Sequence, residues 1–361
     1  MFERRLYHHI DWVLIGAVLA LCALGLSMIY STTGGAGRVY WTQIYALGLG
    51  LIAMAVCLMF DYRSLADKSH WIYLAMMVLL VGVLFFGAVR GGSRRWIDLG
   101  VFNLQPSEFA KATLALMLAK MLGEERRPAL TNNDLFISAA LTAVPFLIIA
   151  RQPDLGTAIT LLPILFVVAY VAGMPMKYIY AGVLVAALAA PIAYKFALQD
   201  YQRERISTFL DPAQDPRGAG YQQIQARITV GSGGVWGKGY MEGTQGQLRF
   251  LPVAHNDFIF SVLAEEQGLI GVLVALGLYF FVIMRALDAA RLAKDRLGAY
   301  LVLGVLSSFT FQVIYNITMS AGLAPVKGLT LPLMSYGGSS MIATLAGFGL
   351  ILNVRMRRFT N

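Results

Sequence analysis

Charged side chains are scarce in this chain of 361 residues. They make up 14% of it, whereas apolar residues make up 58%. The mean hydropathy of +0.64 agrees with that imbalance. Soluble domains carry about 25% charged residues, so the composition excludes an ordinary soluble enzyme. It indicates a helical protein that crosses a membrane several times.

The sequence also lacks the residues that build disulfides and metal centres. The two cysteines, Cys22 and Cys57, lie inside apolar runs, and the four histidines show no metal-ligand spacing. The glycine-rich residues 231–234 lack the Lys-Ser/Thr ending of a nucleotide-binding P-loop. We therefore expect no disulfide, no resident metal site and no nucleic acid partner.

Ten apolar segments approach the length that a helix needs to cross a bilayer, about 20 residues. They are residues 12–31, 43–61, 71–90, 104–122, 135–151, 156–173, 176–197, 258–285, 298–322 and 333–354. The prediction is an all-α, polytopic membrane protein with one transmembrane domain over residues 1–361. A long loop, residues 198–257, joins the seventh and eighth spans. Because ten is even, both termini lie on one side.

The positions of Lys and Arg predict which side that is. Cations gather at both chain ends and in the loops on the side of the termini: Arg4, Arg5, Arg63, Lys68, Arg126, Arg127, Lys177, Arg285, Arg291, Lys294, Arg296, Arg355, Arg357 and Arg358. That side is predicted to be cytoplasmic. The 198–257 loop is then extracytoplasmic.

The outer side carries more cations than the same rule leads one to expect. Arg90, Arg94 and Arg95 lie in a short outer loop, and the long loop contains Lys238 and Arg249. Guanidinium groups match phosphate oxygens in shape and charge. We interpret this basic outer surface as a site for an anionic partner, such as a lipid phosphate or pyrophosphate. The alternative is anchoring of the long side chains at lipid headgroups.

Asp257 stands where the glycine-rich, basic stretch 227–256 meets the eighth span. A carboxylate of ordinary pKa, about 3.9, is ionised at neutral pH and can accept a proton from an attacking hydroxyl. Asp is also a good helix N-cap. The sequence therefore leaves two roles open for Asp257, general base and cap.

Other polar residues at the membrane boundary also have two interpretations. Glu108 and Lys111 share a helix face and form either a structural ion pair or a substrate contact. Asp154 is either a helix cap or a contact to substrate or Arg151. Glu265 and its neighbour Glu266 predict a polar cavity below Asp257 or a pairing with Lys111.

The segment 322–340 is broken by proline and glycine as it enters the last span. Irregular backbone at membrane depth is tolerated only against protein or a wet cavity. Its Ser335 and Ser339 are candidates for contact with a ligand, since small residues allow the backbone to come close. Tight helix packing through small residues is the alternative.

Four motifs together resemble the SEDS family of cell-wall proteins, to which RodA and FtsW belong. They are RRWIDLG…QPSEFAK (94–111), RQPDLGTA (151–158), GSGGVWGKG…GTQGQLRFLPVAHNDFIFSVLAEEQGLIG (231–271) and KGLTLPLMSYGGSS (327–340). The RQPDLGTA turn, GKG followed by GTQGQLRFLP, and the compact length resemble RodA, whereas HNDFIF and the last motif resemble FtsW; the RodA branch is favoured. The resemblance implies a ten-span glycosyltransferase of the bacterial cytoplasmic membrane that polymerises lipid II on the outer face for cell elongation and shape.

The resemblance also implies roles for particular residues. Asp257 is the catalytic candidate. The substrate-binding candidates are Arg94, Arg95, Glu108, Lys111, Asp154, Lys238, Arg249, Ser335 and Ser339. A class B penicillin-binding protein is the expected partner, and a divalent cation could share the neutralisation of pyrophosphate. The alternative functions are a lipid II flippase and a non-catalytic scaffold of the cell-wall synthase.

Overall fold

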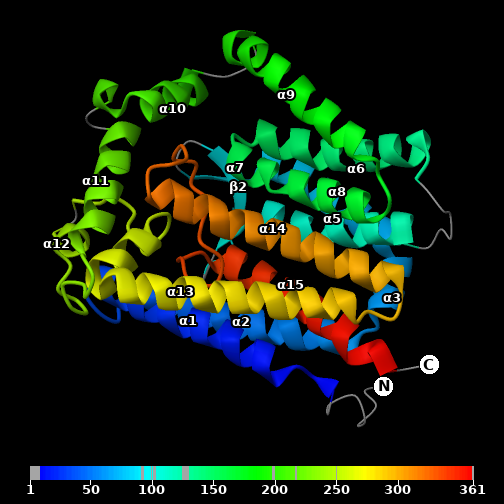
Figure 1. The fold of residues 1–361 in the computed structure, drawn as a ribbon, viewed down its shortest axis with the longest axis horizontal. Coiled ribbons are helices and arrows are strands. Elements are labelled where there is room, and N and C mark those ends of the chain that lie inside the picture. The colour runs from blue at the N-terminus through cyan, green and yellow to red at the C-terminus, as the bar shows by residue number, and fades with distance from the viewer. Residues whose placement is uncertain are drawn as a thin grey trace.

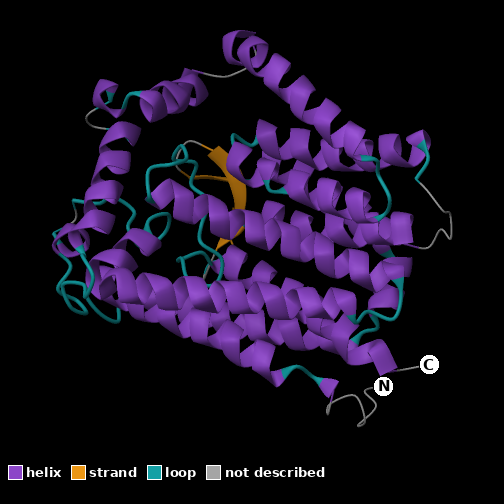
Figure 2. Cartoon of the chain, viewed as in Figure 1, coloured by secondary structure: helices purple, strands orange, loops and turns teal. Residues whose placement is uncertain are grey.

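The computed structural model describes residues 9–90, 93–98, 100, 103–123, 130–196, 200–215, 218–248 and 250–359, and it is mostly helical (Figure 2). The helices are α1 (Trp12–Thr32), α2 (Arg38–Met59), α3 (Tyr62–Asp67), α4 (Ser69–Phe86), α5 (Pro106–Gly123), α6 (Asn132–Arg151), α7 (Leu155–Ile159), α8 (Leu161–Val171), α9 (Met176–Phe196), α10 (Asp200–Leu210), α11 (Ala219–Ser232), α12 (Thr244–Gln247), α13 (Ile259–Arg291), α14 (Arg296–Ser320) and α15 (Gly338–Met356). Two short 3₁₀ turns, Pro212–Gln214 and Arg357–Phe359, complete the helical elements.

Helix α14 lies at the centre of the bundle. It packs against α5, α8, α13 and α15, while α2 covers α15 and α1 lies along α13 (Figure 1). The α2–α15 contact is close because it is made through glycines. A Cβ at Gly349 would lie 2.8 Å from the Met54 carbonyl oxygen. A larger residue there would force the two helices apart.

Seven of the described helices are long and apolar enough to cross a membrane: α1, α2, α4, α6, α13, α14 and α15. Each of the ten predicted segments contains a helix, so the broader prediction of a helical multi-pass membrane protein is confirmed. The three segments outside the seven are those of α5, which carries charged residues, of α7 and α8, which are short, and of α9.

A small antiparallel sheet departs from the all-α prediction. Strands β1 (Ala88–Arg90), β2 (Ser93–Asp98) and β3 (Asn103–Leu104) pair in that order. The helix of the predicted third span therefore ends at Phe86, and Gly87 separates it from β1. The apolar count could not distinguish the strand from more helix, because a short apolar run suits either.

Helix α13 is broken, unlike the continuous eighth span that the sequence predicts. Gly268 has φ +62° and ψ −162°, which separates a short first part from the long remainder. Residues of the 198–257 loop lie against the backbone at this break, since a Cβ at Gly268 would lie 2.3 Å from the Gly237 nitrogen. The predicted loop 198–257 contains α10, α11 and α12, at the end of the bundle opposite the two termini (Figure 1).

Candidate active site

A cavity of about 640 Å³ opens where strand β2, the starts of α2 and α5, and two loops meet. Its lining residues are Arg38, Val39, Thr42, Arg95, Trp96, Gly100, Asn103, Gln105, Glu108, Asp154, Thr157, Asn256, Asp257, Gly328, Leu329, Thr330, Tyr336, Gly337, Gly338, Ser339 and Ser340. This volume lies within the range of about 300–1,000 Å³ that is common for small-molecule sites.

The cavity brings together five of the residues that the sequence singled out. Arg95, Glu108, Asp154, Asp257 and Ser339 all line it, although they come from five separate parts of the chain. Convergence of acids, a cation and a hydroxyl in one hollow is typical of a site for a polar ligand.

Asp257 occupies the turn before α13 and does not cap that helix. The N-cap position is Phe258, and no side chain makes a cap hydrogen bond there. Among the described residues no donor hydrogen bonds to the Asp257 carboxylate. The N-cap interpretation is therefore wrong, and the side chain is available to the cavity that it lines.

The surroundings of Asp257 change its acidity. Burial raises the pKa of Asp257 to about 6, against the charges of Arg205 and Arg95, which lower it. The carboxyl group is thus mostly ionised at pH 7. A pKa close to the working pH is what a general base requires, because the base must be both deprotonated and able to hold a proton.

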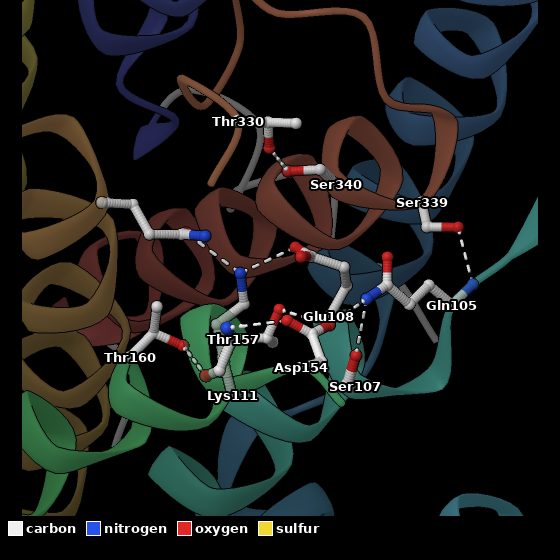
Figure 3. A network of polar contacts seen from close by, with 11 residues as sticks. Gln105, Ser107, Glu108, Lys111, Asp154, Thr157, Thr160, Thr330, Ser339 and Ser340 are labelled. Carbon is white, nitrogen blue, oxygen red and sulfur yellow. Dashed lines mark hydrogen bonds and ion pairs between the residues drawn. The ribbon is translucent and has the colours of Figure 1, made fainter. Parts of the chain in front are cut away.

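Asp154 both caps a helix and contacts the cavity. It accepts hydrogen bonds from the Thr157 backbone amide (3.1 Å) and hydroxyl (2.9 Å), which caps α7. It also accepts one from Gln105 Nε2 at 2.7 Å (Figure 3). Its Oδ2 lies 3.4 Å from Arg95 Nη1. The ion pair is thus with Arg95, not with Arg151. Asp154 orients Arg95 toward the hollow.

Glu108 and Lys111 form a buried ion pair on α5. Lys111 Nζ lies 2.7 Å from Glu108 Oε2 and 3.0 Å from Gln312 Oε1 (Figure 3). Glu108 lines the main cavity, and Lys111 lies behind it beside a second cavity of about 40 Å³. Lys111 therefore pairs with Glu108 rather than with Glu265 or Glu266, and the pair is both structural and part of the cavity wall.

The two predicted serines are placed differently. Ser339 Oγ accepts a hydrogen bond from the Gln105 backbone amide and donates one to the Asn103 carbonyl, both 2.8 Å, at the cavity edge. Ser335 is buried, and its hydroxyl accepts from the Leu331 amide at 2.9 Å. Ser335 holds the loop together and does not line the cavity.

Lys238 and Arg94 do not line the cavity. Lys238 Nζ pairs with the fully buried Glu265 at 2.6 Å, outside the cavity lining. Arg94 is exposed on β2, where strand alternation points it away from its neighbour Arg95. Arg249 lies outside the described residues.

Two cations near the site were missed from the sequence. Arg38 begins α2 and lines the cavity. Arg205 on α10 is near enough to lower the pKa of Asp257. Arg205 was one of many arginines in the outer loop. The useful signal for Arg38 was its position after the first span, on the predicted outer side.

The described residues contain no group of three His, Cys, Asp or Glu side chains arranged to hold a metal ion. The carboxylates of Asp154 and Glu108 each already have a cationic partner. A divalent cation therefore remains a prediction from the chemistry of pyrophosphate.

The chain is similar to known proteins over almost its whole length. Residues 8–359 match the FTSW_RODA_SPOVE family, described as "Cell cycle protein". Peptidoglycan glycosyltransferase MrdB of Escherichia coli K12 is 39% identical over 350 residues, which cover 97% of this chain and 94% of MrdB. Probable peptidoglycan glycosyltransferase FtsW of Trichlorobacter lovleyi is 36% identical over 358 residues, covering 95% of this chain and 92% of that protein.

Solved structures share the fold. A chain from a structure described as the structural coordination of polymerization and crosslinking by a peptidoglycan synthase complex has a TM-score of 0.86 and 37% identity, covering 98% of this chain and 99% of that one. The crystal structure of Thermus thermophilus rod shape determining protein RodA has a TM-score of 0.74 and 34% identity, covering 98% of each chain. These matches include the segments that line the cavity.

Proposed function

This chain belongs to the FTSW_RODA_SPOVE family of cell cycle proteins and is a peptidoglycan glycosyltransferase, and from that premise we propose that its cavity joins lipid II into β-1,4 glycan strands. The observation that carries the proposal is the position of Asp257. Its carboxyl group lines a hollow of about 640 Å³ together with Arg38 and Arg95, and its pKa is raised to about 6. These strands serve cell elongation and shape.

The proposal includes a topology of ten spans in the bacterial cytoplasmic membrane, with both termini in the cytoplasm. Seven helices meet the length and hydropathy of a span, and α5, α8 and α9 are assigned as the remaining three, with α7 leading into α8. The helices α10–α12 lie at the end opposite the termini (Figure 1). The cavity then faces the outside, where the Lys/Arg pattern places the basic loop.

The reaction needs one base and a stabilised leaving group. Asp257 takes the proton of the 4-hydroxyl of the acceptor N-acetylglucosamine as that oxygen attacks the anomeric carbon of the donor N-acetylmuramic acid. The bond from that carbon to the pyrophosphate oxygen breaks, the configuration inverts, and polyprenyl pyrophosphate leaves with the electron pair. The ionised carboxylate of Asp257 supplies the general base.

Cations around the cavity stabilise the leaving pyrophosphate. Arg95 is held by Asp154, and Arg38 lines the same hollow. Positive groups that are already in place when charge develops contribute most to catalysis. Arg94 and Arg249 remain further candidates from the sequence, and a divalent cation could share this role.

We also propose a class B penicillin-binding protein as the partner that crosslinks the new strands. The similarity to a chain of a peptidoglycan synthase complex supports this. The proposed contact involves the spans formed by α13 and α14. Apolar side chains on α13, including Leu273 and Phe280, are more than half exposed.

The test of the function is polymerisation of lipid II by purified protein in detergent micelles. A glycosyltransferase makes polymer there. A flippase yields none, because micelles have no second leaflet to receive the lipid. A scaffold yields none either, but it still supports wall synthesis in cells when Asp257 is replaced.

The polymerisation rate should depend on pH through Asp257. Only the deprotonated carboxylate accepts the hydroxyl proton, so the rate is expected to reach half its maximum near pH 6. Below that pH it should fall about tenfold per unit. Initial rates at saturating lipid II from pH 5 to 8 measure this, with protein integrity checked at each pH. A flat profile over this range would contradict the base role.

Replacing Arg205 by Gln should move this acid limb to higher pH. The charge of Arg205 lowers the pKa of Asp257, so its removal raises that pKa and the carboxylate then protonates at a higher pH. Arg203→Gln is the matched control, since Arg203 lies on the same helix and bonds to the Tyr194 and Lys195 carbonyls. Equal midpoints in Arg205→Gln, Arg203→Gln and wild type would show that Arg205 does not act on the base.

A further inference from the structure

A single amide on the central helix connects the two loops that form the cavity. Asn316 of α14 is fully buried. Its Nδ2 donates to the Asp257 carbonyl oxygen at 2.9 Å and to the Leu329 carbonyl oxygen at 2.7 Å. Asp257 and Leu329 both line the cavity, so one side chain holds both loops.

The amide of Asn316 is used as a donor. Its Oδ1 atom is buried and has no hydrogen-bond partner among the described residues. Both Nδ2 hydrogens are directed at carbonyls on separate loops. A buried polar atom without a hydrogen-bond partner costs free energy. The two hydrogen bonds that the amide donates offset the cost of burying its Oδ1 atom.

The turn that carries Asp257 packs through Ala254 and Phe258 into a buried apolar cluster with Met319 of α14, but few hydrogen bonds hold it. The first part of α13 has no side-chain cap. The Asp257 amide bonds within its own turn, to Val253 O at 3.3 Å, and the Tyr336 amide donates to His255 O at 2.9 Å. Among the described residues, the hydrogen bond from Asn316 is the one that connects this turn to α14, which packs mainly against α5, α8, α13 and α15.

The second loop sets the space beside the carboxylate. Gly328 precedes Leu329 and has φ +64°, and a Cβ built on it would lie 3.5 Å from Asp257 Oδ2. Fixing the Leu329 carbonyl therefore fixes the backbone that faces the reacting oxygen. A shift of either loop would change the distance between base and substrate.

We propose that Asn316 is a positioning residue that holds Asp257 and the 328–330 loop in one fixed arrangement against α14. The inference rests on the proposed function, because it concerns the geometry of the proposed base. Asn316 does not line the cavity, so its effect on the reaction passes through the two carbonyls. A loss of this kind lowers the turnover rate more than the affinity for lipid II.

Asn353 provides a matched control. It is also fully buried, and its Nδ2 donates to the carbonyl oxygens of Cys57 (2.7 Å) and Phe60. It lies near the C-terminal end of α15, and these partners place it at the α2–α3 connection. That end of α15 is at the side of the bundle where the chain termini lie (Figure 1). Replacing either Asn by Leu removes the same chemical group from an equally buried position.

The experiment compares Asn316→Leu, Asn353→Leu and Asp257→Asn with wild type in detergent, by thermal unfolding and by lipid II polymerisation. Both Leu variants are expected to unfold at a lower temperature. Of the two Leu variants, only Asn316→Leu should lose turnover at saturating lipid II, by up to about 100-fold, with KM changed by less than about threefold. Wild-type turnover in folded Asn316→Leu, or an equal loss in Asn353→Leu, would overturn the inference.

Two further results distinguish a failure of this inference from a failure of the proposed function. If Asn316→Leu does not fold, Asn316→Asp has the same shape but cannot donate to both carbonyls, and it should show the same loss of turnover; normal turnover in it overturns the inference. Wild-type polymerisation that stops in Asp257→Asn supports the proposed function independently. A wild-type protein that makes no polymer overturns the proposed function and this inference with it.

Discussion

An Asp257→Asn protein is expected to make no detectable glycan polymer from lipid II. Asn has nearly the same size but cannot accept the hydroxyl proton, and a general base contributes about 10²- to 10⁴-fold to a rate. The fold should survive. Burial raises the pKa of Asp257, so the ionised form is disfavoured there, and a neutral amide should leave the unfolding temperature unchanged or raise it.

The measurement is polymer formation from lipid II by purified variants, with thermal unfolding run in parallel. Asp211→Asn is the control, since Asp211 caps a 3₁₀ turn of the outer loop through a backbone amide, a role that Asn also fills. It should polymerise like wild type. A folded Asp257→Asn protein with normal polymerisation would remove the base role and leave the cavity as a binding site.

The largest loss of stability is expected from Lys111→Met. The change leaves Glu108 buried without its cation, and breaking one side of a buried pair costs about 3–5 kcal/mol. Both side chains are about 90% buried or more. The double variant Glu108→Gln, Lys111→Met removes both charges and should recover most of the loss, as measured by chemical or thermal unfolding in detergent.

Lys120→Met tests whether burial is the reason. Lys120 also lies on α5 and pairs with Asp67 at 2.6 Å, but the Asp67 side chain is 66% exposed. An exposed pair contributes only about 0–1 kcal/mol, so Lys120→Met should be nearly neutral. Similar losses in Lys111→Met and Lys120→Met, or no recovery in the double variant, would contradict this account of the pair.

Hydropathy predicted the helical segments well, because crossing a bilayer is a requirement on about 20 consecutive residues and can be summed locally. Hydropathy failed where the structure depends on residues far away in the sequence or where a short apolar run fits a strand as well as a helix. Strand β1 continues the apolar run of α4. The break at Gly268 lies where residues about 30 positions earlier in the chain, around Gly237, lie against the α13 backbone.

The candidate site likewise has a part that the sequence predicted and a part that it did not. Asp257 and Asp154 were identifiable because an acid at a membrane boundary is unusual in any sequence. Whether each is a cap or a site residue was not identifiable, because an N-cap and a free carboxylate have the same sequence signature. Lys238 looked like a substrate contact until Glu265 was found 2.6 Å from it.

The sequence by itself determined that this is a multi-pass membrane protein, and it predicted a basic outer side and Asp257 as a candidate base. The tertiary structure decided which of these charges meet. Lys111 donates a hydrogen bond to Gln312, which lies 201 positions away in the sequence. The carbonyl oxygen of Asp257 accepts one from Asn316, which lies 59 positions away. Hydropathy and charge bias are properties of neighbouring residues, whereas the partner of a buried polar group depends on which helices pack together.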